Sequence, residues 1–170
     1  MPRVTKKPEE RRQELLDIAE HLFRERGFEN VQVSDIVSSV GVAQGTFYYY
    51  FPSKDDVMLA ILERNWSKFT QMASERIGAH GTDPLRRLLG LMRSFFAPAD
   101  PESMVESYFG GSANPEVFWR FHAAFDEMRL RLFEPVITGI VEDGVAAGVF
   151  APLVHIAGVV EVIFMGISRS

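Results

Sequence analysis

The sequence predicts an all-α protein of about nine helices, and two observations support this fold class. Apolar residues recur at intervals of three and four along most of the chain, and no long stretch alternates with period two. Proline follows a helix-capping residue at three places, which is typical of a helix start: Asp83-Pro84, Asp100-Pro101 and Asn114-Pro115.

The first predicted helix covers residues 9–26, where one face is apolar and basic residues lie in the last turn. Gly27 can adopt the left-handed conformation that ends a helix, so the helix is expected to stop there. The apolar face consists of Leu15, Ile18, Ala19, Leu22 and Phe23.

Two shorter helices are expected next, over residues 34–40 and 44–50. Gly41 allows a tight turn between them. Pro52 ends the second of the pair, because proline pushes the preceding residue out of the helical region. Two short helices joined by a glycine-containing turn are typical of a helix-turn-helix.

A long helix is expected over residues 54–79, with Ser53 as its N-cap and Asp56 completing an approximate capping box. Further along, Pro135 predicts a kink or a new helix start, and Gly148 predicts a helix end. The later helices are expected over residues 84–97, 101–109, 115–132, 135–147 and 154–168.

Composition restricts the class of protein. The chain has 170 residues, of which 46% are hydrophobic and 24% charged, as in a globular rather than a disordered protein. It contains no cysteine, which excludes disulfides and thiolate metal sites. No apolar stretch is long enough to span a membrane, and the N-terminus does not resemble a signal peptide. We therefore expect a soluble cytoplasmic protein.

The net charge of −5 is unevenly distributed. Residues 1–54 hold eight Lys/Arg and eight Asp/Glu, whereas residues 55–170 hold ten and fifteen. Among the first 12 residues, five basic side chains outnumber two glutamates. A basic arm of this kind either attracts phosphate or is a frayed, solvated end.

The helix over residues 44–50 carries a polar and aromatic outer face. Its glutamine can bond adenine edges, and its threonine methyl can contact the thymine methyl. Tyrosine hydroxyls and the amine of Lys54 suit phosphate oxygens, as do the free amides near Ser34. The alternative is that the tyrosines form a core aromatic cluster. The candidate DNA-binding residues are Ser34, Gln44, Gly45, Thr46, Tyr48, Tyr49, Tyr50 and Lys54.

Residues 9–66 resemble the N-terminal domain of the TetR family of bacterial transcriptional regulators. The run GFENVQVSDIVSSVGVAQGTFYYYFPSKDDVMLAIL carries the resemblance, above all in its glycine turn, aromatic cluster and following Ser-Lys. It implies a helix-turn-helix DNA-binding domain over residues 1–53, joined by the long helix to a helical ligand-binding and dimerisation domain over residues 54–170. By position it implies base contacts from Gln44, Gly45 and Thr46 and phosphate contacts from Tyr48, Tyr50 and Lys54.

The last predicted helix, over residues 154–168, suggests a dimer. From residue 156 to residue 167 Glu161 is its one charged residue, so the helix is apolar all round and must be covered on every side. A second subunit is a natural cover, and residues 134–147 resemble a dimer helix of the family. We therefore expect a homodimer through these two helices. The alternative is an ordinary central core helix.

The family resemblance implies that a small effector enters among the middle helices. The residues there are rich in aromatic side chains and methionine, which suit an adaptable apolar pocket but also an ordinary core. His122 lies on an apolar face and either bonds a polar group of the ligand or is satisfied within the core. The candidate ligand-binding residues are Met92, Phe95, Phe96, Tyr108, Phe109, Phe118, Phe121, His122 and Phe125.

The predicted function is that of a TetR-like transcriptional regulator: a repressor that binds a palindromic operator as a dimer and is released by a small, largely apolar or aromatic effector. The alternative is a DNA-binding regulator or architectural protein with no small-molecule effector. An enzyme is not expected, because the sequence holds no metal-ligand spacing, nucleophile–base grouping or phosphate loop. No cofactor or metal is expected.

Overall fold

The computed structural model describes residues 7–79, 81–95, 108, 115–152 and 158 of the chain. The chain divides into two compact units, which are treated in turn. One comprises residues 1–64 and 102–122, and the other residues 65–101 and 123–170. The predicted boundary at residue 53 concerns function and stays a prediction.

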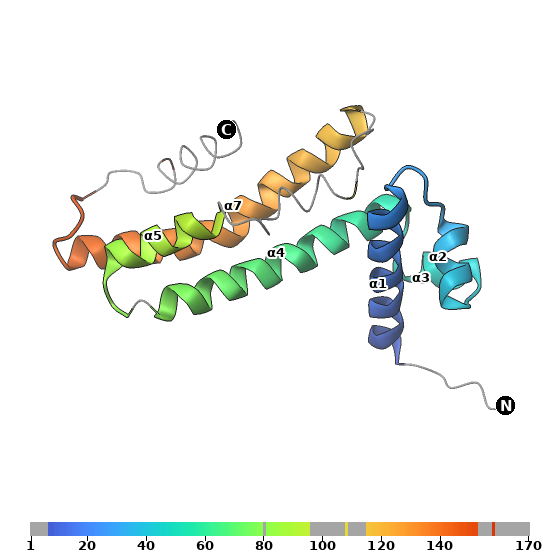
Figure 1. Cartoon of the computed structure of the whole chain (residues 1–170), viewed down its shortest axis with the longest axis horizontal. Coiled ribbons are helices and arrows are strands. Elements are labelled where there is room, and N and C mark those ends of the chain that lie inside the picture. Colours follow the sequence, from blue (N-terminus) through green and yellow to red (C-terminus); the bar gives the residue numbers. More distant parts are fainter. Residues whose placement is uncertain (1–6, 80, 96–107, 109–114, 153–157, 159–170) are drawn as a thin grey trace. The chain divides into compact units, whose positions relative to one another are not determined.

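The described part of the chain consists of helices and the turns between them (Figure 1). The predicted all-α class is confirmed, and two of the helices, α3 and α4, have the predicted bounds. The predicted helices over residues 101–109 and 154–168 lie almost wholly outside the described residues. The helices are α1 (Pro8–Arg26), α2 (Val33–Val40), α3 (Gln44–Tyr50), α4 (Lys54–Ala79), α5 (Pro84–Phe95) and α7 (Pro115–Ala146).

α7 continues through Pro135, so the predicted new start at this residue is wrong. Proline removes one main-chain donor from a helix and weakens it at that turn. Phe133 and Ile137, on either side of the proline, are buried, and their packing offsets the lost hydrogen bond. The helix ends before Gly148, whose φ of 70° lies in the region that favours glycine.

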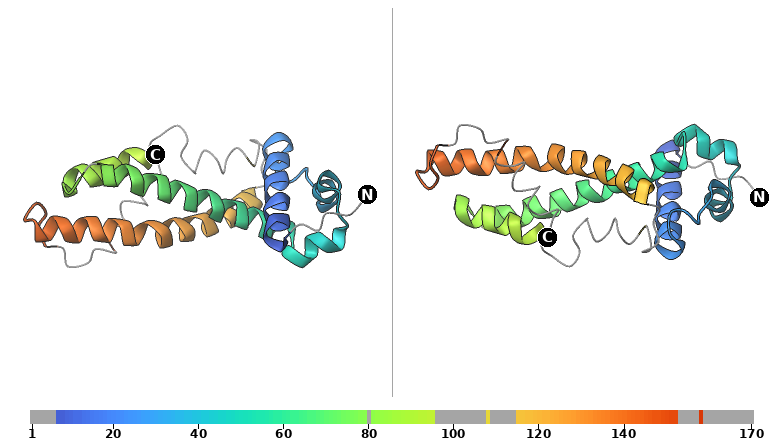
Figure 2. Two further views of the ribbon diagram at one scale, coloured as in Figure 1. Left: turned by 90° about the horizontal axis from the view of Figure 1, so that it is seen from below. Right: turned by 90° about the horizontal axis from the view of Figure 1, so that it is seen from above.

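In the first unit, α2 and α3 lie together beside α1 (Figures 1 and 2). Leu15, Ile36 and Phe47 come from the three helices in turn, and none of these side chains is exposed. Gly41 adopts the left-handed conformation (φ 75°, ψ 39°), and its N–H donates to the Val37 carbonyl at 2.9 Å. α2 and α3 therefore form the predicted helix-turn-helix.

Gly27 ends α1, but the predicted left-handed cap at this residue is wrong. Its φ is 80° and its ψ is 146°, a combination that is essentially restricted to glycine. Its N–H still donates to the carbonyl of Phe23, at 2.9 Å. The chain therefore leaves α1 with an extended ψ at Gly27. Residues 28–32 then form the turn that precedes α2.

The starts of α4 and α5 are capped as the sequence predicts. The hydroxyl of Ser53 donates to the Asp56 carboxylate and accepts the N–H of Asp56, at 3.2 Å. Asp83 Oδ1 accepts the N–H of Leu85 at 3.0 Å and that of Arg86 at 3.2 Å. Each cap satisfies amides that have no partner within the first turn of a helix.

The second unit contains the later part of α4, α5 and most of α7. Trp66, Phe69 and Phe133 form an aromatic cluster in its core, with ring centroids 5.6 to 5.8 Å apart. Arg87 Nη1 lies 2.5 Å from Asp143 Oδ2 and ties α5 to α7. The unit is thus held by apolar burial, with an ion pair at its edge.

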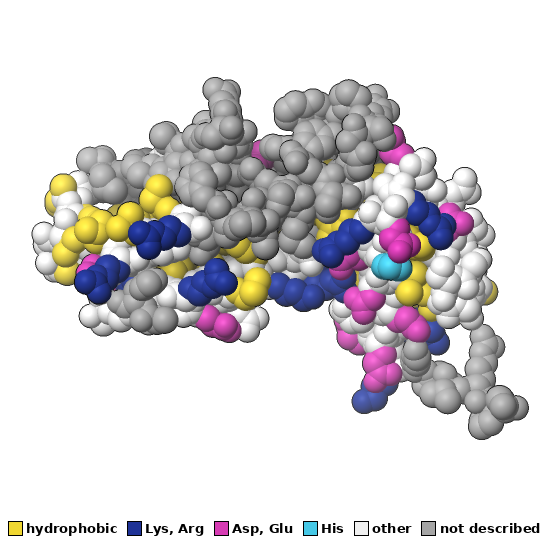
Figure 3. All heavy atoms as spheres, in the orientation of Figure 1, with side chains coloured by type: hydrophobic (Ala, Val, Ile, Leu, Met, Phe, Trp, Pro, Cys, Tyr) yellow, Lys and Arg dark blue, Asp and Glu magenta, His cyan; other side chains and the backbone are white. Residues whose placement is uncertain are grey.

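Apolar side chains reach the surface of the second unit over α5 (Figure 3). Leu85 is 48% exposed and Leu89 46%, while Met72 on α4 is 51% exposed. Within the described ranges, every helix is too short or too polar to cross a membrane.

Gly144 in α7 allows the close packing of Phe150, which follows the helix. A Cβ at position 144 would overlap the Phe150 ring, whereas a Cβ at Gly139 would meet no atom within 4 Å. Gly144→Ala should therefore lower the free energy of unfolding by about 1–3 kcal/mol. Gly139→Ala, in the same helix, should raise it by about 0.5–1 kcal/mol, because alanine favours helix. Urea denaturation of the two variants checks both values, and equal stabilities would contradict this account.

Candidate nucleic-acid interface

α3 presents one face to the core and another to solvent. Phe47 is fully buried, whereas Tyr48 is 50% exposed and Tyr49 77%. Gln44 and Gly45, at the start of the helix, are also exposed. Their amides and side chains lie at the end of α3 that a helix-turn-helix directs at base edges. The exposed tyrosines argue against the alternative of a core aromatic cluster.

Aromatic packing holds α3 in place. The Phe47 and Phe51 rings lie 5.9 Å apart, and the guanidinium carbon of Arg12 in α1 lies 5.1 Å from the Phe51 ring centroid. On the outer side, the rings of Tyr49 and Tyr50 meet edge to face at 4.9 Å. Thr46 and Tyr50 are half-buried. The outer face is thus partly rigid before any ligand binds.

The start of α2 supplies a second exposed polar region. Ser34 is exposed in the first turn. The Asp35 carboxylate accepts the N–H of Gln32 at 2.7 Å, and the Ser39 hydroxyl donates to the Asp35 carbonyl at 2.8 Å. The side chain of Asp35 therefore faces its own backbone, and the serine is the side chain of this turn that is presented to solvent.

The side chain of Lys54, the first residue of α4, does not project freely into solvent. Its Nζ donates to the carbonyls of Phe28 and Val31, at 2.7 Å each, and lies 4.2 Å from the Phe28 ring centroid. Burial lowers the pKa of its ammonium, against the opposing effect of Asp55 and other nearby carboxylates. An ammonium has three donors, and these two carbonyls occupy two of them, so the predicted phosphate contact of Lys54 stays a prediction.

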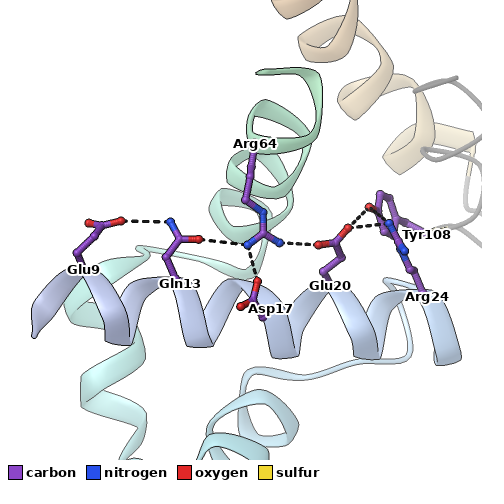
Figure 4. A network of polar contacts seen from close by, with 7 residues as sticks. All are labelled: Glu9, Gln13, Asp17, Glu20, Arg24, Arg64 and Tyr108. Carbon is purple, nitrogen blue, oxygen red and sulfur yellow. Dashed lines mark hydrogen bonds and ion pairs between the residues drawn. The ribbon is translucent and has the colours of Figure 1, made fainter. Parts of the chain in front are cut away.

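A polar network that the sequence analysis missed runs along α1 (Figure 4). Arg64 of α4 donates to Glu20 Oε2 at 2.5 Å, to Asp17 Oδ1 at 2.6 Å and to Gln13 Oε1 at 3.2 Å. Gln13 Nε2 in turn donates to Glu9 Oε1 at 3.2 Å. The spacing of these α1 residues, three or four apart, was visible in the sequence, but their partner in α4 was not.

Tyr108 closes the other end of this network. Its hydroxyl donates to Glu20 Oε1 at 2.7 Å, and Arg24 Nη2 donates to the hydroxyl oxygen at 3.3 Å. Its carbonyl accepts the N–H of Phe28 at 2.7 Å. Tyr108 is therefore bound to the helix-turn-helix unit through both side chain and main chain.

The titration of Tyr108 predicts a pH dependence of stability. Burial, together with the bond to Glu20, raises the pKa of its hydroxyl to about 12. Unfolding returns this pKa to about 10, so the folded state favours the neutral phenol. The contribution is complete below pH ~10 and is lost as the pH rises towards ~12. Tyr108→Phe should flatten this alkaline loss when unfolding is measured as a function of pH, and an unchanged pH dependence would contradict this account.

The predicted ligand-binding residues are only partly described. Tyr108 and Phe121 both belong to the first unit, where Phe121 is buried and meets the Phe28 ring edge to face at 5.2 Å. Met92 is half-buried on α5, in the second unit. The side chains that lie outside the described residues are Phe95, Phe96, Phe109, Phe118, His122 and Phe125. Their role in ligand binding stays a prediction.

Comparison with known proteins identifies the helix-turn-helix. Residues 15–61, which include α2, α3 and the start of α4, match the bacterial regulatory proteins of the tetR family. Over 152 residues the chain is 31% identical to the HTH-type transcriptional repressor KstR2 of Mycolicibacterium smegmatis, with 89% of this chain and 73% of that protein covered. The chain belongs to the tetR family. It is a transcriptional regulator and not an enzyme, as the sequence predicted.

Solved structures show the tetR fold over nearly the whole chain. The fatty acid degradation regulator FadR of Bacillus halodurans aligns with a TM-score of 0.66 at 23% identity, covering 97% of this chain and 83% of that one. FadR of Bacillus subtilis in complex with stearoyl-CoA aligns with a TM-score of 0.65 at 22% identity, covering 92% and 83%. At this identity the likeness concerns the fold alone.

Proposed function

We propose that this tetR-family regulator is a cytoplasmic repressor that binds a palindromic operator as a homodimer and is released by a small, largely apolar or aromatic effector. The observation that carries the proposal is the outward face of α3, where a buried phenylalanine holds exposed Gln44, Tyr48 and Tyr49 towards solvent. The 31% identical relative is itself named a transcriptional repressor.

The proposed contacts divide by chemistry. Gln44, Gly45 and Thr46, at the start of α3, read base edges in the major groove. Ser34 and the tyrosines at positions 48–50 bond phosphate oxygens and position the helix. In a homodimer joined through residues 134–147 and 154–168, the two helix-turn-helix motifs would occupy successive major grooves ~34–36 Å apart.

The effector is proposed to be a compound with a long apolar part. The aromatic and methionine residues of the middle helices suit such a ligand. FadR of Bacillus subtilis, which shares the fold, was crystallised with stearoyl-CoA, so an acyl thioester is the first compound to test. Binding must favour the state that does not bind DNA by a few kcal/mol to release the operator.

A fluorescent duplex from the promoter of the protein's own gene tests DNA binding by anisotropy. Wild type should bind this duplex more tightly than a scrambled duplex at the same salt concentration, and Tyr48→Ala should bind it more weakly. Equal binding by wild type and Tyr48→Ala would contradict the assignment of the helix-turn-helix, α2 and α3, as the DNA-binding surface.

The same complex tests the effector. Stearoyl-CoA should lower the anisotropy, whereas coenzyme A alone should not, because it lacks the apolar chain. Stearate alone separates the contribution of the chain from that of the thioester. If no apolar ligand changes DNA binding, the alternative of a regulator or architectural protein without an effector is favoured.

A further inference from the structure

The first residue of α4 reaches back to the turn that precedes the helix-turn-helix. Lys54 Nζ donates to the carbonyls of Phe28 and Val31, at 2.7 Å each. We propose that Lys54 is a positioning residue for DNA binding, which fixes the turn at residues 28–31 rather than contacting phosphate. This role of Lys54 goes beyond the proposed function and requires only that the helix-turn-helix binds DNA.

The surroundings of the Lys54 ammonium leave little room for a phosphate. Two of its three donors are used by carbonyls, and the centroid of the Phe28 ring lies 4.2 Å from Nζ. The side chain is half-buried, and burial lowers its pKa, as expected where water is partly excluded. Moving Lys54 to a phosphate would leave two carbonyls without these donors.

The turn matters because it determines where α2 begins. Val31 is fully buried, and α2 starts two residues later, at Val33. The Gln32 carbonyl accepts the N–H of Asp35 at 3.0 Å and that of Ile36 at 3.4 Å, so the turn leads directly into the helix. α3 follows α2 through the Gly41 turn, and a displacement of the turn therefore displaces the recognition helix.

The salt dependence of DNA binding separates a positioning role from a phosphate contact. Lys54→Met keeps much of the length of the side chain and removes its donors. If Lys54 positions the turn, binding to the promoter duplex weakens about tenfold or more at every salt concentration. The slope of log K against log salt then stays close to that of wild type, because Lys54 itself neutralises no phosphate. A slope smaller by about 0.9 per contact, or wild-type affinity, overturns the proposal.

Amide hydrogen exchange separates positioning from general stabilisation. Lys54→Met should accelerate exchange at residues 28–36 and leave the core of the second unit unchanged, while circular dichroism shows a folded protein. Lys68→Met, at an exposed lysine of the same helix, is the matched control and should change neither exchange nor affinity. Uniformly faster exchange along the chain overturns the proposal. This arm holds even if the wild type fails to bind the chosen duplex.

The wild-type protein provides a test if Lys54→Met does not fold. The chain has four lysines, Lys6, Lys7, Lys54 and Lys68, so the ammonium spectrum of lysine-labelled protein is simple. The Lys54 ammonium should give a slowly exchanging signal without DNA, and the signal should not change when the promoter duplex binds. A signal that is protected only in the DNA complex overturns the proposal.

Discussion

An Arg64→Met variant is expected to lose about 1–3 kcal/mol of unfolding free energy, because it removes one of the two arginines that pair with the Glu20 carboxylate, in a site where 15% of that side chain is exposed. The guanidinium bonds Glu20, Asp17 and Gln13 of α1 from α4, and its own side chain is 14% exposed. Urea denaturation at a fixed protein concentration measures the loss.

Two variants control this experiment. Arg86→Met removes an arginine whose side chain is 76% exposed, and should change the free energy of unfolding by less than about 0.5 kcal/mol. Adding Glu20→Gln to Arg64→Met should recover part of the loss, because the carboxylate that has lost one of its two arginines is then neutral. If Arg64→Met is as stable as Arg86→Met, the network does not stabilise the protein.

Phe47→Ala is expected to lower the free energy of unfolding by about 3–5 kcal/mol and to abolish binding to the promoter duplex. The Phe47 ring is fully buried, and its removal leaves a cavity between α3 and the core of the first unit. Without this anchor, α3 no longer holds its outer side chains at a fixed place. Denaturant unfolding measures the first effect, and fluorescence anisotropy the second.

Tyr49→Ala, two residues along the same helix, is the matched control. Its side chain is 77% exposed, so stability should change by less than about 0.5 kcal/mol. DNA binding should still weaken, by about tenfold, if the hydroxyl bonds a phosphate. A Phe47→Ala protein that binds the duplex as tightly as Tyr49→Ala does would show that the inward ring does not orient the helix.

The parts of the fold that were predictable are those determined by neighbouring residues. Ser53 and Asp83 cap helices within three residues of themselves, and both starts were predicted. Pro135 was expected to cause a kink or a new helix start, because proline disrupts isolated helices. The burial of Phe133 and Ile137 outweighs that preference, and burial depends on the tertiary structure.

The candidate site follows the same rule. The outward face of α3 was predictable from the order of its residues. The hydrogen bond from Lys54 to the Phe28 carbonyl was not predictable, because Phe28 lies 26 positions earlier in the chain. The partner of Tyr108 was equally hidden, since Glu20 lies 88 positions away. An amphipathic pattern assigns a side chain to a face but does not say which distant group meets it.

The environment of Phe28 limits how DNA specificity could be exchanged between members of the family. Its ring packs on Phe23 and Phe121, and its N–H donates to the Tyr108 carbonyl. Two of these partners belong to residues 102–122 rather than to the N-terminal segment. A chimera that takes only an N-terminal fragment would place a foreign Phe28 against unmatched neighbours. Transplanting residues 1–64 together with residues 102–122 would keep these partners beside Phe28, so a segment that is distant in sequence must accompany the N-terminal residues in such a chimera.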